Sequence, residues 1–505
     1  MNIVAKNKEI LKSIFVEPQA EIIASSKDSI TSEQALWHWW GETASQLIAM
    51  TLDEVDQRLY QEYKKKGWRV ERMDSRTVQC LFGPLTYRRR LLAKPGSRAK
   101  SFYPLDRKLG FEKGKRYSLA LMGRITRIMA MTTCRNTSQA VELLTPCTVS
   151  HQTVIAIKDH VGEKANTYAR VIAEQEPEKK ISPKAHILAI EGDGIVMKTQ
   201  AKRKVGTAGK GGKTKELHRI QVYTGVEKNG RRSRLTGYRC FAGEDRKQVV
   251  REVRAFIHHH YALGNLTVLS NGDGGAGYSF TDFDDMVEGC GRHEHFRDKY
   301  HVNEKIRTRL SFCPAAFVNK FTKAIGKSDS QGIRKQLKAL LDTAESLART
   351  KDEIEQVKRL GGYLERNMDY IPSLTLRGID TGDSGIHLGT AESGHRYYSF
   401  RMKKQGRCWS VKGLETMAGV MTAIKNGELE QALLYKASGV NYKKLDRVLY
   451  KAVAQTVRQA QNTRQKAQAK RRAHNYRPGC IEGRIAVYSP TSSPMGQLAK
   501  AIQNW

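Results

Sequence analysis

Two aspartates that each follow a buried-strand pattern constrain the fold of this chain more than any other feature. A mainly apolar run at 185–190 leads to Asp193, and a second run at 266–270 leads to Asp273. Glycine flanks both aspartates, which permits a sharp turn at a strand end and a close approach by a ligand. A single Asp-Gly turn would be ordinary, but two of them after buried strands predict one paired site.

The elements between these aspartates predict how they come together. Strand patterns at 217–225 and 235–241 and a helix pattern at about 244–262 give the order strand, strand, strand, helix, strand. In a ribonuclease-H-like α/β sheet the first and fourth strands are neighbours, so Asp193 and Asp273 would lie a few ångströms apart. Like charges that close need cations between them, and hard divalent ions with oxygen ligands, Mg²⁺ or Mn²⁺, fit that need.

A third carboxylate should come from a later helix, and three candidates stand out. Glu365 lies in a polar helical stretch typical of a surface, and Glu415 fits either a helix or a salt bridge. Glu392 follows the Gly-rich loop at 378–389. The cationic side chains after it are His395, Arg396, Arg401, Lys403 and Lys404. We select Glu392, because a carboxylate among phosphate-binding cations suits a DNA-cutting site; the alternative is a glutamate favoured by the helix macrodipole.

The metal site predicted from these residues would serve phosphodiester chemistry. Two ions about 4 Å apart, held by Asp193, Asp273 and Glu392, would activate water or a 3′-hydroxyl and stabilise the leaving oxygen. The attack would be in line on a DNA phosphodiester, and it would need no covalent intermediate with the protein.

The net charge predicts a polyanionic partner. The chain has 87 Lys and Arg residues against 51 Asp and Glu residues, a formal net charge of +36, and a pI near 9.9. DNA or RNA is the leading partner; an anionic membrane and a merely solubilising surface are weaker alternatives. The chain has no run of about 18 apolar residues, and its eight scattered cysteines form no CxxC pair, which indicates reduced thiols.

The N-terminal region combines a helix with a basic hairpin. Helical spacing covers 29–66, with Ser29 or Thr31 as N-cap, and its tryptophans are expected to pack in a core. Residues 77–92 alternate as two strands around a turn at 83–84. The second strand carries three consecutive arginines: Arg88, Arg89 and Arg90. This ribbon could follow DNA phosphates, and a solvated strand face is an equal alternative.

Three helices are predicted next. They cover about 117–132, 137–145 and 151–161, and Ser150 would cap the third. A tight turn before the third helix is typical of a helix-turn-helix, which places one helix in the DNA major groove. Any three-helix bundle has the same pattern, so a purely structural bundle is the alternative.

A Lys/Gly-rich stretch at 202–215 interrupts the strand order. It opens with Lys202, Arg203 and Lys204 and lacks the GxxxxGK[ST] phosphate loop, so nucleotide binding is rejected. We interpret it as a mobile contact to the DNA backbone.

A zinc site at Cys290, His293 and His295 is disfavoured. These residues supply only three donors, and no fourth donor lies nearby in the sequence.

The order and spacing of a set of short motifs resemble an insertion-sequence transposase. The motifs are Leu188-Ala-Ile-Glu-Gly-Asp-Gly, Leu269-Ser-Asn-Gly-Asp-Gly-Gly, Asp298-Lys-Tyr-His, Ala391-Glu-Ser-Gly-His and Gly406-Arg-Cys-Trp-Ser. No single motif is specific. Together they resemble the bacterial DDE transposases of the ISLre type, which are related to Mutator-like transposases, over nearly the whole chain.

This resemblance implies a ribonuclease-H-like catalytic core with a helical insertion between the second aspartate and the glutamate. It also implies Asp298 and His301 as accessory site residues, because Mutator-like relatives carry Cys or Asp, two residues, and His after the second aspartate. A capping aspartate and a structural histidine are the alternative for this pair. The stretch at 202–215 departs from the compact strand connection that the family would have.

We therefore expect an α/β protein with six regions. They are an N-terminal helical region with the basic hairpin (1–105), a helix-turn-helix-like DNA-binding domain (106–173), the first part of the ribonuclease-H-like core (184–312), the helical insertion (313–385), the final core helix (386–425) and a basic C-terminal region (426–505).

The expected function is that of a transposase acting on the ends of an insertion sequence and on target DNA. Synapsis of two ends implies at least a dimer, and the expected location is the bacterial cytoplasm, at the nucleoid. Two alternatives stay open: a ribonuclease-H-like nuclease that cuts without joining, and a nucleic-acid-binding protein without catalysis.

Overall fold

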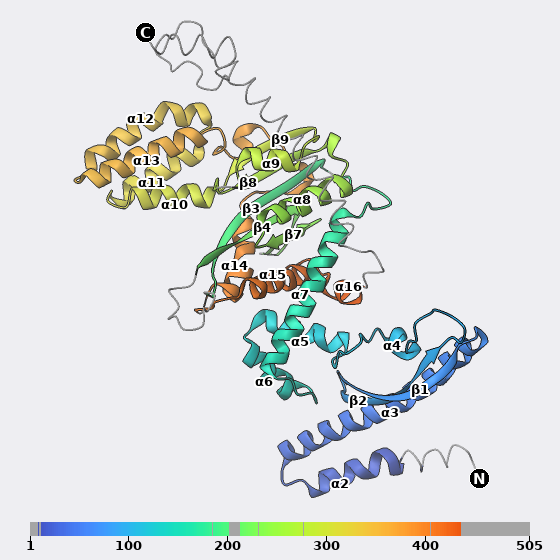
Figure 1. Cartoon of the computed structure of the whole chain (residues 1–505). Coiled ribbons are helices and arrows are strands. Elements are labelled where there is room, and N and C mark those ends of the chain that lie inside the picture. Colours follow the sequence, from blue (N-terminus) through green and yellow to red (C-terminus); the bar gives the residue numbers. More distant parts are fainter. Residues whose placement is uncertain are drawn as a thin grey trace, which may run out of the picture. The chain divides into compact units, whose positions relative to one another are not determined.

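A mixed five-stranded sheet positions both aspartates. The computed structural model describes residue 9 and residues 12–435, apart from 184, 201–212, 231, 276 and 405. The strands of the sheet are β3 (Ile187–Lys198), β4 (Thr214–Tyr223), β7 (Arg239–Gly243), β8 (Thr267–Gly272) and β9 (Arg292–Arg297). Their order is β7-β4-β3-β8-β9 (Figure 1). β4 is antiparallel to β3 and β7, whereas β8 is parallel to β3 and β9. The expected adjacency of the first and fourth strands, β3 and β8, is confirmed.

Side chains alternate along β3 between two helical layers. The covering helices are α7 (His151–Glu174), α8 (Arg246–His260), α9 (Phe280–Met286), α14 (Ala391–Met402) and α15 (Val411–Lys425). Leu188 and Ile190 join a core with α8 and α9. Ile195 and Met197 join the opposite core with α7, α14 and α15. Asp193 has the parity of Ile195 and therefore faces the layer that contains α14.

The strand expected at 235–241 is divided in two. An additional antiparallel hairpin, β5 (Gly225–Asn229) and β6 (Arg232–Thr236), precedes β7. Gly237 lies between β6 and β7 with φ +57°, a left-handed conformation that ends one strand before the next begins. The alternation of apolar residues in the sequence could not reveal this break, so the two short strands were predicted as one.

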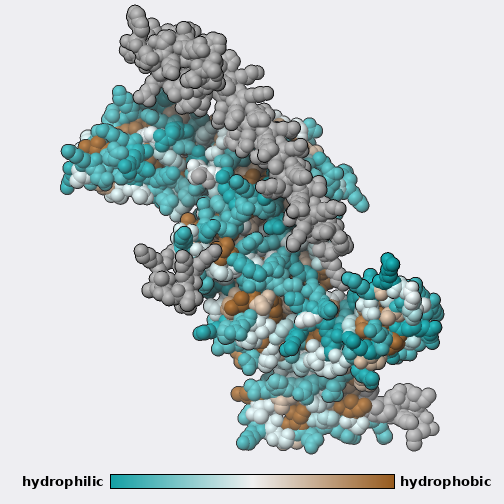
Figure 2. Space-filling view, viewed as in Figure 1, coloured by the Kyte–Doolittle hydropathy of each residue, from teal (hydrophilic) through white to brown (hydrophobic). Residues whose placement is uncertain are grey.

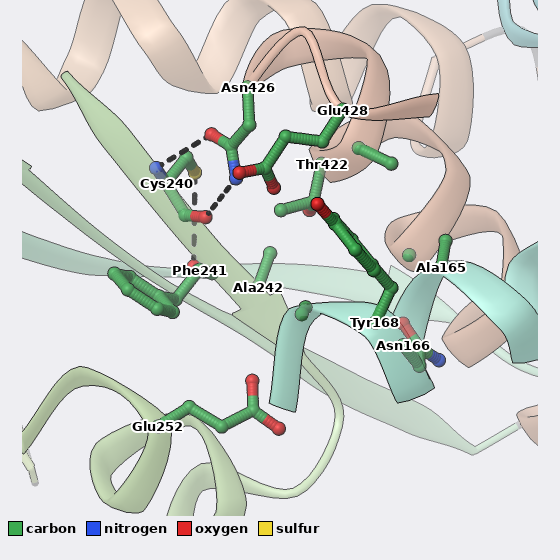
Figure 3. A pocket seen from close by; sticks show the side chains of 13 residues that line it. Ala165, Asn166, Tyr168, Cys240, Phe241, Ala242, Glu252, Thr422, Asn426 and Glu428 are labelled. Carbon is green, nitrogen blue, oxygen red and sulfur yellow. Dashed lines mark hydrogen bonds between the residues drawn. The ribbon is translucent and has the colours of Figure 1, made fainter. Parts of the chain in front are cut away.

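The outer edge of β7 is closed by the end of α15. The Cys240 N–H donates to Asn426 Oδ1 (2.9 Å), and Asn426 Nδ2 donates to the Cys240 carbonyl oxygen (3.0 Å), as Figure 3 shows. The side-chain amide thus supplies the donor and the acceptor that a further strand would supply.

The N-terminal helix and hairpin form as predicted, with two shifted details. After a short π-helix (Lys12–Val16) and α2 (Glu17–Ser25), α3 spans Ser29–Lys65. Its N-cap is Asp28, whose Oδ1 accepts from Thr31 N–H (2.8 Å), and not Ser29 or Thr31. β1 (Arg69–Cys80) and β2 (Gly83–Ala93) are antiparallel. Gln79 pairs with Pro84, so the turn is at 81–82 and the predicted turn residues begin the second strand.

The tryptophans of α3 are not core residues, contrary to expectation. Trp37 and Trp40 are 54% and 46% exposed. The core between α3 and the hairpin begins further along the helix, where Leu52 packs with Val78 and Leu85. Figure 2 shows brown apolar patches over α2 and α3. Helical spacing identified the apolar stripe, but it could not show that only the later part of α3 meets the hairpin.

Three helices follow the hairpin. They are α4 (Pro104–Leu109), α5 (Leu119–Met131) and α6 (Cys134–Leu144), and α7 comes after them. The predicted cap of α7 is confirmed, because Thr153 N–H donates to Ser150 Oγ (3.2 Å). α7 continues to Glu174 and buries Val154, Ile157 and Val161 in the core shared with α15. It joins the three-helix region to the sheet, and its role in a helix-turn-helix stays a prediction.

A helical insertion lies between β9 and α14. α10 (Lys299–Arg309), α11 (Ala315–Lys327), α12 (Ser330–Leu347) and α13 (Lys351–Asn367) share their own apolar cluster. Two 3₁₀ turns (Thr375–Arg377 and Gly382–Ser384) lead to α14, and α16 (Leu429–Leu434) follows α15. These elements belong to one compact unit, Met1–Tyr435. In the described part of the chain, none of the helices has the length and hydropathy to span a bilayer.

Candidate metal centre

The sheet places both aspartates at one edge of two neighbouring parallel strands. Gly192 of β3 pairs with Gly272 of β8, and an aspartate follows each glycine. Asp193 continues within β3 and is 9% exposed. Asp273 has left β8 and is half-buried, and its Oδ1 accepts a hydrogen bond from Gly275 N–H (2.7 Å).

The glycines before the two aspartates are required by packing. A Cβ on Gly192 would lie 2.8 Å from Tyr278 Cδ1, and a Cβ on Gly272 would lie 2.7 Å from the Tyr278 carbonyl oxygen. A Cβ atom cannot lie that close to a heavy atom to which it is not bonded, so any larger residue would displace the segment that leads into α9. The close approach predicted at these glycines is therefore made by the chain itself.

Helix α14 brings a carboxylate and an imidazole to Asp193. Glu392 and His395 are three residues apart and share one side of the first turns of α14. Ligand atoms of Asp193, Glu392 and His395 all lie within 4.8 Å of one another. His395 Nδ1 is 3.2 Å from Asp193 Oδ2. Among the described residues, no other group of three or more Asp, Glu, His or Cys side chains is close enough to share a metal ion.

The rival candidates for the third carboxylate lie elsewhere. Glu365 is exposed on α13 and Glu415 is exposed on α15, and neither belongs to the group around Asp193. Asp273 is also outside that group. The structure therefore brings Glu392 to Asp193, and it places Asp273 directly after the end of the neighbouring strand β8.

Helix α10 adds His301 to the same edge. His301 Nε2 is 3.6 Å from Asp193 Oδ2. Asp298 is the N-cap of this helix: its Oδ1 accepts from Tyr300 N–H (2.9 Å) and His301 N–H (3.2 Å), and its Oδ2 accepts from Asn271 Nδ2 (3.2 Å). Of the two accessory residues, His301 contacts the site, whereas Asp298 holds the helix that carries it.

The charges of these groups shift one another's pKa values. Burial raises the pKa of Asp193, but the contact with His301 and the nearby imidazole of His395 outweigh burial and leave the pKa of Asp193 below its usual value. Burial and the negative charge of Asp193 raise the pKa of Glu392. Burial and the positive charge of Arg219 lower the pKa of His395 to about 4.

We predict that His301 titrates far above an ordinary histidine in the metal-free protein. Its ion pair with Asp193 raises its pKa from 6.5 to about 9, against the opposing effect of burial. The pair therefore stabilises the fold fully below about pH 6.5, and this contribution is lost as the pH rises through about 9. NMR of ¹³C-labelled histidine should show this titration, and Asp193→Asn should bring it back toward 6.5. A value near 6.5 in the unmutated chain would contradict the pairing.

The donor set around Asp193 fits a divalent cation. Two carboxylates supply oxygen ligands, and an imidazole that is neutral at pH 7 can donate a lone pair. His395 meets this condition because its pKa is lowered, and its Nε2 is buried without a hydrogen-bond partner among the described residues. His395 was counted in the sequence only as a cation after Glu392, although its spacing from Glu392 would have placed it on the same helix side.

The residues considered for zinc do not converge. His293 Nε2 and His295 Nδ1 both contact Ser270 Oγ, at 2.7 and 2.8 Å, and His293 Nδ1 contacts Asp284 Oδ1 (2.9 Å). Cys290 packs instead against the core of α8 and α9. These contacts form a chain of hydrogen bonds through a buried serine, as expected for structural histidines.

The three arginines of β2 have different surroundings. Arg88 is exposed. Arg89 pairs with Asp106, and Arg90 Nη1 pairs with Asp56 Oδ2 (2.6 Å). Arg89 and Arg90 are therefore already paired with aspartates of the protein. Of these three arginines, Arg88 is the one that β2 exposes to solvent.

The cations after Glu392 also differ. Lys403 and Lys404 are exposed. Arg401 is 3% exposed, and its Nε donates to the Met129 carbonyl oxygen (2.8 Å). The expectation that Arg401 contacts DNA is therefore corrected: the residue lies in the core between α14 and α5. Lys202, Arg203 and Lys204 lie outside the described residues.

Comparison with known proteins identifies relatives along most of the chain. Residues 30–436 match the "Uncharacterised protein family (UPF0236)". The "UPF0236 protein in vanSb 3'region" of Streptococcus gallolyticus is 32% identical over 417 residues, which cover 81% of this chain and 86% of that protein. A UPF0236 protein of Caldanaerobacter subterraneus subsp. tengcongensis is 23% identical over 415 residues, 80% of each chain.

Solved structures give weaker likenesses. A Drosophila P element transposase strand transfer complex matches with a TM-score of 0.24 and 10% identity, over 68% of this chain and 83% of that chain. A pre-cleavage Mos1 transpososome matches with a TM-score of 0.13 and 13% identity, over 50% and 79%. Scores this low carry no argument about fold or site. The sequence relatives do: by its match from residue 30 to residue 436 and by its identity to the streptococcal protein, the chain belongs to the UPF0236 family.

Proposed function

We propose that this protein is a transposase that binds the ends of an insertion sequence and carries out metal-dependent DNA cleavage and strand transfer. The observation that carries the proposal is the meeting of Asp193, from the first strand of the sheet, with Glu392, from a helix far downstream. Asp273 stands at the same edge, after the parallel neighbour of that strand. Strand order and directions agree with a ribonuclease-H-like core, which supports a DDE arrangement of these three carboxylates.

The side chains divide the work at this edge. Asp193, Glu392 and His395 would hold one divalent cation, and Asp273 would contribute to a second. Mg²⁺ or Mn²⁺ bound there would supply an activated water and would stabilise the leaving oxygen of a phosphodiester. His301, whose Nε2 lies 3.6 Å from Asp193 Oδ2, would offer an N–H donor to the phosphate. Asp298 fixes the orientation of His301 through the cap of α10.

DNA is the substrate favoured by charge and by the relatives. The net charge of +36 favours a polyanionic partner, and Arg88, Lys403 and Lys404 are exposed cations suited to phosphate contacts. The name printed for the Caldanaerobacter relative consists of several locus labels, from TTE0033 to TTE2212. A gene that occurs at many loci of one genome is what repeated transposition would leave behind. A dimer or larger assembly on DNA would be needed to hold two ends.

A strand-transfer assay tests this proposal against its alternatives. The donor plasmid carries the gene of this protein with its own flanking DNA, the matched control lacks the flanks, and a second plasmid is the target. We expect donor cleavage and joined products with Mg²⁺ and none with EDTA or with the control donor. Cleavage without joined products would instead support a nuclease. Binding of the donor DNA without any cleavage would support a DNA-binding protein that lacks catalysis.

A further inference from the structure

A buried glutamate that the mechanism does not use lies two residues before Asp193. Glu191 is fully buried, and it is on the same side of β3 as Asp193. Its Oε1 accepts from Tyr223 Oη (2.6 Å) and Gly389 N–H (3.0 Å), and its Oε2 accepts from Ala391 N–H (2.6 Å) and Gln221 Nε2 (3.5 Å). Each carboxylate oxygen therefore faces two donors, so an acceptor-only group is required at this position.

Two of these donors are backbone amides that flank the start of α14. Ala391 is the first residue of the helix, and Glu392 follows it directly. The N-cap residue Thr390 gives no side-chain cap to its own helix. Glu191, which lies in β3, therefore caps α14 in place of Thr390, because its carboxylate lies where the first amides of α14 point.

Further bonds fix the same few residues to the sheet. Gln221 Nε2 donates to Thr390 Oγ1 (2.7 Å), and Arg219 Nη1 donates to the Ala391 carbonyl oxygen (3.0 Å). Residues 389–391 are thus bonded to two adjacent strands. The loop before them contains left-handed glycines at 378, 382 and 385, and Gly389 of the anchored segment is also left-handed, so this backbone could take many paths without these bonds.

Glu392 depends on this anchoring more than the other site residues do. Its side chain is exposed, and no hydrogen bond or ion pair with another described residue holds it. Asp193 is fixed within a central strand, and His395 is buried against it. The position of the Glu392 carboxylate is therefore set by where α14 begins.

We propose that Glu191 is a positioning residue: its carboxylate anchors residues 389–391 and so holds Glu392 within metal-sharing distance of Asp193. This inference rests on the proposed function, because it assigns the support of the same metal centre. Glu191 itself touches neither metal nor substrate. It acts through the start of α14, as residues behind a ligand do in many metal sites.

The test is a double-mutant cycle on Mn²⁺ affinity, measured by electron paramagnetic resonance with the full chain and no DNA. Glu191→Gln keeps the size of the side chain but points an amide donor at two other donors. We expect Mn²⁺ affinity to fall by about tenfold or more. In the Glu392→Gln background, where there is no carboxylate left to position, the same change should cost less than about twofold.

A matched control separates positioning from general damage. Glu252 of α8, labelled in Figure 3, is another largely buried carboxylate, and it bonds to Gln248 (2.7 Å) and Arg170 (3.3 Å) away from α14. Glu252→Gln should leave Mn²⁺ affinity within about twofold. Tyr223→Phe removes only one donor to Glu191 and should give a smaller loss than Glu191→Gln, which keeps the test open if the latter variant folds poorly.

Hydrogen exchange provides a readout that needs no metal. The amides of Gly389 and Ala391 should exchange faster in Glu191→Gln, while those of β8 should be unchanged. The inference is overturned if Glu191→Gln leaves Mn²⁺ affinity intact, or if it lowers affinity equally with and without Glu392. If Mn²⁺ affinity changes in the cycle as expected but the protein neither cuts nor joins DNA, only the proposed function is refuted. If the protein carries out strand transfer but Mn²⁺ affinity does not follow the cycle, only this inference is refuted.

Discussion

Replacement of Asp193 by asparagine is expected to lower DNA cleavage and strand transfer by about a thousandfold or more while DNA binding is retained. The change keeps the shape of the side chain but removes the negative charge that His301 and His395 face and that a cation bound by the cluster would need. Metal affinity should fall with activity, because Asp193 is the member of the cluster that both imidazoles and Glu392 surround. Cleavage in Mg²⁺ and binding of the flanking DNA are measured side by side.

The matched control for this experiment is Glu415→Gln. Glu415 was a rival for the third carboxylate, and it is exposed on α15 outside the cluster. It should keep both activities. Full cleavage by Asp193→Asn, or an equal loss in Glu415→Gln, would show that the cluster around Asp193 is not the place of the chemistry.

The adjacency of the two strands that lead to Asp193 and Asp273 could be predicted from the sequence because it depends on local patterns. Buried strands, their order and the short Gly-Asp ends are all readable along the chain, and sheet geometry then makes β3 and β8 neighbours. The choice of Glu392 had a weaker basis, since it depended on surrounding charge. The start of α14 is held by hydrogen bonds that the amides of Gly389 and Ala391 donate to Glu191, which precedes them in the chain by 198 and 200 positions. Such contacts have no local signature.

Charge alone misassigned part of α14. Arg401 was grouped with Lys403 and Lys404 as a DNA contact, yet it lies on the helix face that also carries Tyr398 and Met402, which is buried in the core. Burial lowers the pKa of Arg401 to about 10, and its guanidinium is satisfied by a backbone carbonyl of α5. Helical phase, if applied within α14, would have separated the buried cation from the exposed ones and grouped His395 with Glu392.

The second large effect is expected at the crossing of α7 and α15, where Gly162→Ala should destabilise the fold by about 2–3 kcal/mol. A Cβ on Gly162 would lie 2.3 Å from the Thr416 carbonyl oxygen and 2.7 Å from Thr416 Cα. Both are backbone atoms, so the helices themselves would have to separate. The neighbouring cavity, which is drawn in Figure 3 and lined by Ala165 and Gly419, measures about 20 Å³ and cannot absorb such a shift.

Gly326→Ala is the matched control for this prediction, because Gly326 lies in α11 and a Cβ added there would meet nothing within 4 Å. The gain in helix propensity should make that variant neutral or more stable by up to about 1 kcal/mol. Differential scanning calorimetry should show Gly162→Ala melting about 2–4 °C lower, with Gly326→Ala unchanged or slightly higher. Since α15 packs against α14 and β7 as well as α7, separation of this crossing should also loosen the helix that carries Glu392, and Mn²⁺ affinity should decline together with the melting temperature. Equal melting temperatures for the two alanine variants would mean that the two helices do not cross as closely as the structure places them.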